Sequence, residues 1–328
     1  MTEIAIIGGG VIGLACGLEL ARRNLQVTIL ERDLPGQGAT WAAAGMLAPT
    51  AEALIGELAD LANASLSLYP NWISEIQGIT GDNSGFWQCG ILALDPNLSP
   101  GNWLSARDLA QKQAGLNLAG AHWLESEGQV DNRRLVTNLE LAARSLGVQI
   151  QAGIQVEKIA THHDRVTHLQ TSLGEIRADR YLLAAGAWTR ALLPLPITPR
   201  KGQMLAVLAR DRPLNRIIYG AGIYLVPRQD GRIIIGASVE DVGFLPGNQA
   251  ATVQGLLARA IDLYPAIAAM EIIDTWWGFR PHVPGEMPIL GASDYQNLAL
   301  ALGHYRNGIL LAPITAQVVA DFLTRELA

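Results

Sequence analysis

Hydrophobic and polar positions near the N-terminus predict a strand, a helix and a second strand in close succession. The apolar run 4–7 is typical of a buried parallel strand, and Gly8-Gly9-Gly10 ends it. A helical pattern covers 11–23, and a second apolar run over 27–30 ends at Glu31. This order within about 30 residues predicts the opening unit of a doubly wound sheet.

The remaining pattern predicts two regions of different character. Helices are expected over 52–76, 132–146, 250–263 and 309–326, a loop of small residues over 36–48, and short strands over 86–94, 148–152, 156–160, 164–178 (a hairpin) and 181–186, with a last strand from 298. Longer strand-like runs with few helices lie at 204–208, 217–226 and 232–237. This change predicts a second, mostly antiparallel lobe.

We therefore expect an α/β protein with a discontinuous Rossmann-like domain and a smaller, mostly antiparallel β domain. The first domain is predicted to comprise 1–80, 122–197 and 280–328, and the second 81–121 and 198–279. The length of 328 residues agrees with about two domains.

Composition narrows the class of protein. Apolar residues make up 49% of the chain, which allows a large core, and the net charge of −6 argues against nucleic-acid binding. No apolar run reaches the ~18 residues of a membrane span. The two cysteines, Cys16 and Cys89, have no CxxC spacing. No cluster of His, Cys, Asp or Glu has the spacing of metal ligands. The sequence from Met1 onward shows no leader pattern. These features predict a cytoplasmic protein without a metal site.

The turn after the first strand carries the strongest chemical signal. Gly8, Gly10 and Gly13 form a GxGxxG motif between a strand and a helix, and Glu31 ends the next strand. In such a motif the glycines allow a tight turn, a close approach to a pyrophosphate and close helix–strand packing, and the acidic residue accepts hydrogen bonds from a ribose. A tight turn without a ligand is the alternative.

The motif fits both NAD and FAD. The following segment 38–46 is dominated by Ala and Gly and leaves room for a broad, flat ring, which favours FAD. The motif, Glu31-Arg32 and the segment 40–46 resemble the D-amino-acid oxidase family of FAD-dependent amine oxidoreductases, and within it the glycine oxidases of thiamine synthesis. The resemblance covers essentially the whole chain, with further matching segments at 183–188, 224–228, 278–281 and 303–308.

The resemblance implies a Rossmann-like FAD-binding domain and a substrate domain. It implies cofactor contacts from Gly8, Gly10, Val11, Ile12, Gly13, Glu31, Arg32, Thr40, Ala43, Ala44, Gly45, Met46, Val156, Gly186, His304, Tyr305, Arg306, Asn307, Gly308 and Ile309. Related sarcosine oxidases attach their flavin through a late cysteine. Because no cysteine follows Cys89, FAD is expected to bind non-covalently.

Three residues are candidates for substrate binding. Arg280 lies in an apolar segment, where a guanidinium needs a partner; a substrate carboxylate or a protein carboxylate would serve. Tyr224 lies on an alternating strand and is either a second ligand of that carboxylate or a core tyrosine. The resemblance assigns both side chains to the substrate and places Arg306 near it. The alternative for Arg306 is an exposed side chain in a glycine turn.

The resemblance implies oxidation of glycine, sarcosine and small D-amino acids by oxygen, giving a 2-oxo acid, ammonia and hydrogen peroxide. It also implies delivery of the glycine imine to a thiazole-forming enzyme, and a homo-oligomer. Three alternatives remain open: a D-amino-acid dehydrogenase with another electron acceptor, an NAD-dependent dehydrogenase, and a flavin-binding scaffold without turnover.

Overall fold

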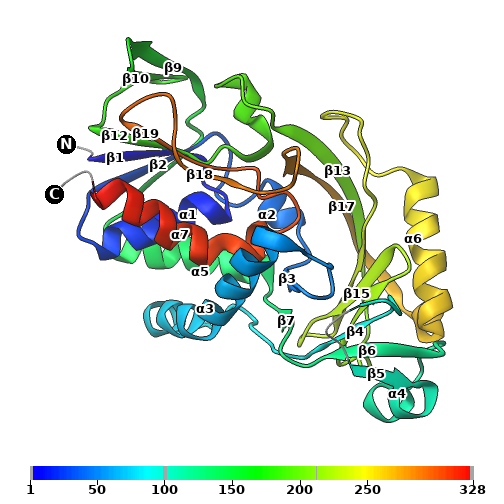
Figure 1. The fold of residues 1–328 in the computed structure, drawn as a ribbon. Helices are drawn as coiled ribbons and strands as arrows, with labels where there is room; N and C mark the ends of the chain where they lie inside the picture. The colour runs from blue at the N-terminus through cyan, green and yellow to red at the C-terminus, as the bar shows by residue number, and fades with distance from the viewer. Residues whose placement is uncertain (1–2, 99–101, 212, 326–328) are drawn as a thin grey trace.

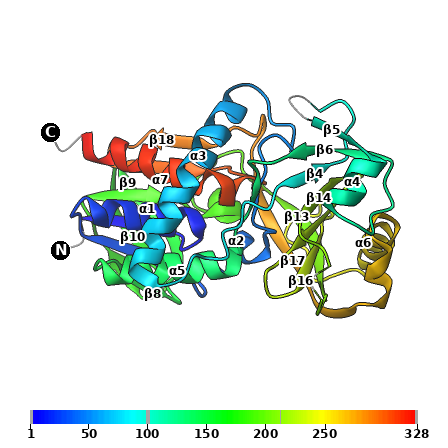
Figure 2. The same cartoon turned by 90° about the horizontal axis from the view of Figure 1, so that it is seen from below.

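The computed structural model describes residues 3–98, 102–211 and 213–325. Two lobes lie side by side, one containing the N-terminal and C-terminal helices and the other containing the long strands β13 (Thr198–Leu208) and β17 (Glu271–His282) (Figures 1 and 2). Residues 1–2 of the predicted start and residue 326 of the predicted last helix lie outside the described residues.

A six-stranded sheet forms the centre of the first lobe. Its order is β18 (Ile289–Ala292), β19 (Leu298–Leu302), β12 (Arg180–Leu183), β1 (Ile4–Ile7), β2 (Val27–Glu31) and β8 (Gln149–Ala152). All neighbouring pairs are parallel except β18 and β19. The residues of β1 are buried because both faces of the sheet are covered, which explains its uninterrupted apolar sequence.

Helices cover one face of this sheet and a small sheet covers the other. The helices are α1 (Val11–Arg22), α5 (Asn132–Ser145) and α7 (Gly308–Arg325), and α3 (Gly56–Thr80) packs on α5 and α7 (Figure 1). The small sheet comprises β9 (Val156–His162), β10 (Arg165–Thr171) and β11 (Gly174–Ile176). Each face therefore buries its own apolar cluster.

The second lobe is an eight-stranded sheet. Its order is β17, β13, β16 (Arg232–Gly236), β15 (Ile223–Pro227), β14 (Ile217–Gly220), β4 (Ile91–Ala93), β6 (Gly120–Leu124) and β5 (Asn102–Ser105). Only the pair β14–β4 is parallel among the described strands of this sheet. Apolar side chains of α6 (Ala250–Leu263) pack on one face, and α4 (Ala106–Lys112) and a 3₁₀ turn, η2 (Pro265–Ala269), lie nearby.

Short elements connect the lobes. They are α2 (Ala39–Ala42), the 3₁₀ turn η1 (Gly186–Ala191) and the paired strands β3 (Met46–Leu47) and β7 (Gly128–Gln129). Gly278 of β17 allows α2 to approach closely, since a Cβ at this position would lie 2.3 Å from the Cβ of Ala42. The indole nitrogen of Trp276 then donates to the carbonyl of Ala42 at 3.1 Å.

The predicted α/β class, with a Rossmann-like sheet and a mostly antiparallel second sheet, is confirmed. Several predicted elements differ in detail. The run 217–226 is two strands joined by a turn at Ala221 (φ 52°), the run 86–94 contains only β4, and the expected loop 36–48 contains α2 and β3. The domain boundaries stay a prediction; β6 lies across the boundary at 121/122 and β17 across that at 279/280.

None of the helices in the described part of the chain combines the length and apolarity that a membrane span requires.

Candidate active site

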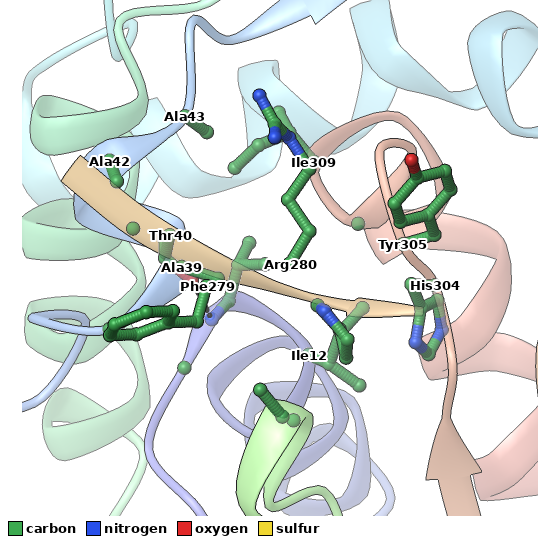
Figure 3. A pocket seen from close by; sticks show the side chains of 18 of the residues that line it. Ile12, Ala39, Thr40, Ala42, Ala43, Phe279, Arg280, His304, Tyr305 and Ile309 are labelled. Atoms are coloured by element: carbon green, nitrogen blue, oxygen red, sulfur yellow. Dashed lines mark hydrogen bonds between the residues drawn. The ribbon is translucent and has the colours of Figure 1, made fainter. Parts of the chain in front are cut away.

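A cavity of about 810 Å³ runs between the two lobes, a size in the range of small-molecule sites. Every site residue predicted from the sequence lines it except Gly13 and Asn307. Figure 3 shows Arg280 projecting from β17 into this space, with Thr40, Ala42 and Ala43 on one side and His304 and Tyr305 on the other.

The glycine turn at one end of the cavity leaves no room for side chains. A Cβ on Gly13 would lie 1.9 Å from the carbonyl oxygen of Gly8, and a Cβ on Gly8 (φ 108°) would lie 2.5 Å from that of Ala184. Gly13 therefore acts behind the cavity wall, where it lets α1 pack closely on the strand. The N-terminus of α1 faces the cavity, a geometry that favours phosphate groups.

Thr40 and Glu31 fix this turn. The hydroxyl of Thr40 accepts the backbone N–H of Val11 at 3.0 Å, which ties α2 to the start of α1. Glu31 accepts the N–H groups of Gly9 at 2.7 Å and Asp33 at 3.0 Å through its two oxygens. Since each carboxylate oxygen has two acceptor sites, Glu31 retains capacity for ribose hydroxyls.

Hydrogen bonds from Arg228 hold the segment 43–46 in place. This buried guanidinium donates to the carbonyls of Ala44 and Val130, both at 2.8 Å, and to the side chain of Asn132 at 3.0 Å. The amide of Asn132 in turn donates to the carbonyl of Thr40 at 2.8 Å. Burial lowers the pKa of Arg228 to about 10, so it stays charged at neutral pH.

The loop before α7 closes the other side of the cavity. His304 is buried and its Nε2 lies 3.0 Å from the Thr315 hydroxyl, and burial lowers its pKa to about 3. A neutral, hydrogen-bonded histidine of this kind is structural. The N–H of Tyr305 donates to the carbonyl of Pro281 at 3.0 Å, which fixes the loop to the strand that carries Arg280. Asn307 is buried behind the loop.

Arg280 and Tyr224 share a polar pocket made possible by glycines. A Cβ on Gly202 would lie 2.4 Å from the Arg280 guanidinium, and a Cβ on Gly236 would lie 2.5 Å from the Tyr224 hydroxyl. Arg280 donates to the carbonyl of Ser238 at 3.2 Å, and no protein carboxylate forms an ion pair with it among the described residues. Burial raises the pKa of Tyr224 to about 12, against the opposing effect of Arg280, so its hydroxyl remains a proton donor.

Glu52 and Tyr219 complete this end of the cavity and were missed from the sequence. Glu52, with a 10% exposed side chain, lies 3.3 Å from Nε of Arg306. Tyr219 pairs with Tyr224 across β14 and β15, and its hydroxyl accepts a hydrogen bond from Arg306 at 2.8 Å. Burial raises the pKa of Glu52 despite Arg306 and Arg280, and Glu52 raises the pKa of Arg306.

A second carboxylate positions Glu52. Glu127 is buried and accepts the backbone N–H groups of Thr50 at 2.5 Å and Ala51 at 3.2 Å. Burial raises its pKa to about 7. Glu52 stands alone between apolar residues in the sequence, so only its neighbours in space indicate a role.

The described residues contain no group of three or more His, Cys, Asp or Glu side chains placed to hold a metal ion. The glycine cradle, the helix N-terminus and the large cavity do fit a dinucleotide with an attached flat ring.

Comparisons with known proteins agree with this site. The family described as FAD dependent oxidoreductase (DAO) matches residues 3–322. The bifunctional protein ThiO/ThiG of Trichormus variabilis is 49% identical, with 99% of this chain and 53% of that protein covered. The chain thus spans about half the length of these bifunctional relatives.

Two further comparisons cover nearly the whole length of both proteins. The glycine oxidase of Geobacillus kaustophilus is 34% identical over 99% of this chain and 93% of that protein. The crystal structure of glycine oxidase from the same organism superimposes with a TM-score of 0.93, covering 98% of this chain and 94% of that chain at 34% identity. The chain therefore belongs to the DAO family of FAD-dependent oxidoreductases, and FAD is its cofactor.

Proposed function

We propose that this protein oxidises glycine and small D-amino acids to a 2-oxo acid, ammonia and hydrogen peroxide, and sarcosine to a 2-oxo acid, methylamine and hydrogen peroxide. Its similarity to glycine oxidases supports this function. The observation that carries the proposal is the pairing of the Arg280 guanidinium with the Tyr224 hydroxyl at the end of the cavity. A guanidinium fork and a neutral phenol are suitable donors for an α-carboxylate.

The site also offers groups of both charges, as an amino acid requires. Arg280 would face the α-carboxylate of the substrate, and Glu52 is the acidic side chain near Arg280. We infer that Arg306, which is ion-paired with Glu52 and hydrogen-bonded to Tyr219, closes this end. The ion pair fixes Arg306 in one orientation and leaves Arg280 for the substrate.

The role of the protein is mainly orientation. Bound FAD would supply the two-electron oxidation, with oxygen as the final electron acceptor. The chain holds the α-carboxylate so that the Cα–H bond has one orientation in the cavity. Because this orientation is fixed on binding, the entropic part of the activation barrier is lower. The oxidised amino acid is an imine, and water hydrolyses it to the 2-oxo acid and ammonia, or methylamine in the case of sarcosine.

The residues expected to hold FAD divide along the cavity. The turn 8–13 and Glu31 would bind the pyrophosphate and ribose, and the segments 40–46 and 304–309 would face the ring. FAD binding is expected to be non-covalent.

We further propose that the imine from glycine is passed to a thiazole-forming enzyme. The ThiO/ThiG relatives are named bifunctional proteins, so two activities share one chain in them, which supports such a partner. A homo-oligomer and a cytoplasmic location stay predictions.

A peroxide assay with glycine, sarcosine and D-alanine tests the proposed function. We expect peroxide from the wild-type protein with glycine and much less from Arg280→Ala at equal FAD content. Turnover of an artificial electron acceptor without peroxide would instead favour a D-amino-acid dehydrogenase. An absence of any turnover in the FAD-loaded protein would favour a non-catalytic scaffold.

A further inference from the structure

Three aromatic rings pack together at the rim of the cofactor cavity. Trp188 of η1 stacks on Phe244 with ring centroids 5.3 Å apart and an interplanar angle of 19°. Phe244 also meets Phe279 of β17 edge-on at 5.1 Å. Trp188 and Phe279 are 6.3 Å apart. Phe244 therefore bridges η1 and β17, and we call these three residues the rim cluster.

The rim cluster forms part of the cavity wall at the nucleotide end. Trp188 and Phe279 line the cavity, and so does Arg32, whose guanidinium lies 3.8 Å from the Trp188 ring centroid. Arg32 directly follows Glu31, the predicted ribose ligand. Phe244 packs on the rings of Trp188 and Phe279 but does not itself line the cavity, and it remains 45% exposed. Its contact with the cofactor site is thus indirect.

Phe244 lies in the middle of an irregular segment, 237–249, that is fastened near both ends. Asp241 forms an ion pair with Arg200, and Glu240 exchanges backbone hydrogen bonds with Lys201 at 2.9 and 3.0 Å. The side chain of Asn248 donates to the carbonyl of Trp276 at 2.9 Å. These contacts hold the ends of the segment on β13 and β17.

Between these contacts, Phe244 is flanked by two glycines with positive φ. They are Gly243 (φ 60°) and Gly247 (φ 88°), and a Cβ on either would meet no atom within 4 Å. Glycine adopts this backbone conformation without steric cost, which lets the segment turn on both sides of Phe244.

We propose that Phe244 is a positioning residue for FAD: by holding Trp188 and Phe279 together, it keeps the nucleotide end of the cavity closed and slows release of the cofactor. Release requires η1 and β17 to separate at this rim. Phe244 bridges them with two ring contacts, so its removal lowers the barrier to opening. The proposal rests on the FAD site of the family and is independent of which amine is oxidised.

The substrate end is expected to be insensitive to Phe244. Arg280 and Phe279 are adjacent on β17 and project in different directions, Arg280 into the substrate end (Figure 3). Neighbouring residues of a strand point to opposite faces. At saturating FAD, loss of Phe244 should therefore leave kcat and KM unchanged.

Dissociation of FAD from the loaded protein after dilution, followed by the rise of free-flavin fluorescence, tests the proposal. Phe244→Ala should release FAD about tenfold faster, the change expected when ring contacts worth about 1.4 kcal/mol in total are lost. Leu245→Ala is the matched control, because Leu245 is the adjacent residue, apolar and 48% exposed. It should release FAD at the wild-type rate. Phe244→Tyr, which keeps the ring, should restore slow release.

A purely structural role for Phe244 makes a different prediction. In that case the melting temperature of the apoprotein would fall in Phe244→Ala, and the release rate would rise only in proportion. We expect the faster release from Phe244→Ala at a temperature well below the melting temperatures of both variants, where the unfolded fraction is negligible. If Phe244→Ala does not fold, Phe244→Leu, which keeps apolar area without a ring, takes its place. Equal release rates for Phe244→Ala or Phe244→Leu and the Leu245→Ala control would overturn the proposal.

Discussion

Replacing Arg280 by alanine should remove most of the affinity for the substrate carboxylate while leaving the flavin in place. The guanidinium donates to the Ser238 carbonyl, lies beside the Tyr224 hydroxyl, and has no carboxylate ion pair among the described residues. Its remaining N–H groups are therefore available to a ligand. Gly202 provides the space in which they lie.

The magnitude follows from the expected bidentate contact. Each hydrogen bond between charged groups contributes about 1.5–3 kcal/mol, so two contribute about 3–6 kcal/mol. Water that enters the enlarged pocket offsets part of this loss. Since each ~1.4 kcal/mol corresponds to a factor of about 10, kcat/KM for glycine should fall by about 10²- to 10³-fold.

Steady-state peroxide formation measures this change, and the visible spectrum of each variant reports its FAD content. Arg280→Lys is the informative companion, because it keeps the charge and loses the planar fork. We expect it to recover only a small part of the activity. For an amine substrate without a carboxylate, kcat/KM should be the same in both variants as in the wild type. A kcat/KM for glycine within about threefold of wild type in Arg280→Ala would show that Arg280 does not bind the carboxylate.

Three further outcomes follow from the structure. Tyr224→Phe should raise KM for glycine with the flavin spectrum kept, and an unchanged KM would exclude its contact with the carboxylate. Gly13→Ala should abolish FAD binding, because the new Cβ would clash with the turn, whereas Gly78→Ala, in open space on α3, should bind FAD normally in a fluorescence titration. Because the folded pKa of His304 is about 3, below the unfolded value near 6.5, the unfolded chain gains a proton that the folded protein excludes as pH falls. Urea unfolding at about pH 5 and about pH 7.5 measures how far the free energy of unfolding falls between the two pH values. This fall should be about 2 kcal/mol smaller in His304→Gln than in the wild type, and an equal fall in both proteins would contradict the prediction.

Local sequence patterns predicted the parts of the fold that depend on local geometry. The turn at Gly8 and Gly13, the strand that ends at Glu31 and α5 each follow from spacing within a short segment. The longest strand, β17, was not predicted. It lies at the edge of its sheet and exposes residues on both faces, so its burial does not alternate.

Parts of the site that depend on distant contacts could not be predicted from spacing. Glu52 and Arg306 are far apart in the sequence and meet only because the loop after β3 folds against the start of α7. Phe244 lies in an irregular, exposed segment, where no periodic pattern indicates its contact with Trp188. Arg280 was found because a charge in an apolar segment needs a partner, which is a physical signal in the sequence itself.

We propose that this FAD protein oxidises glycine bound by Arg280. The most direct test is the visible spectrum of the FAD-loaded protein before and after anaerobic addition of glycine. The flavin absorbance should bleach with wild-type protein, and bleach far more slowly with Arg280→Ala at the same glycine concentration. A flavin spectrum that glycine leaves unchanged in the wild-type protein would contradict it.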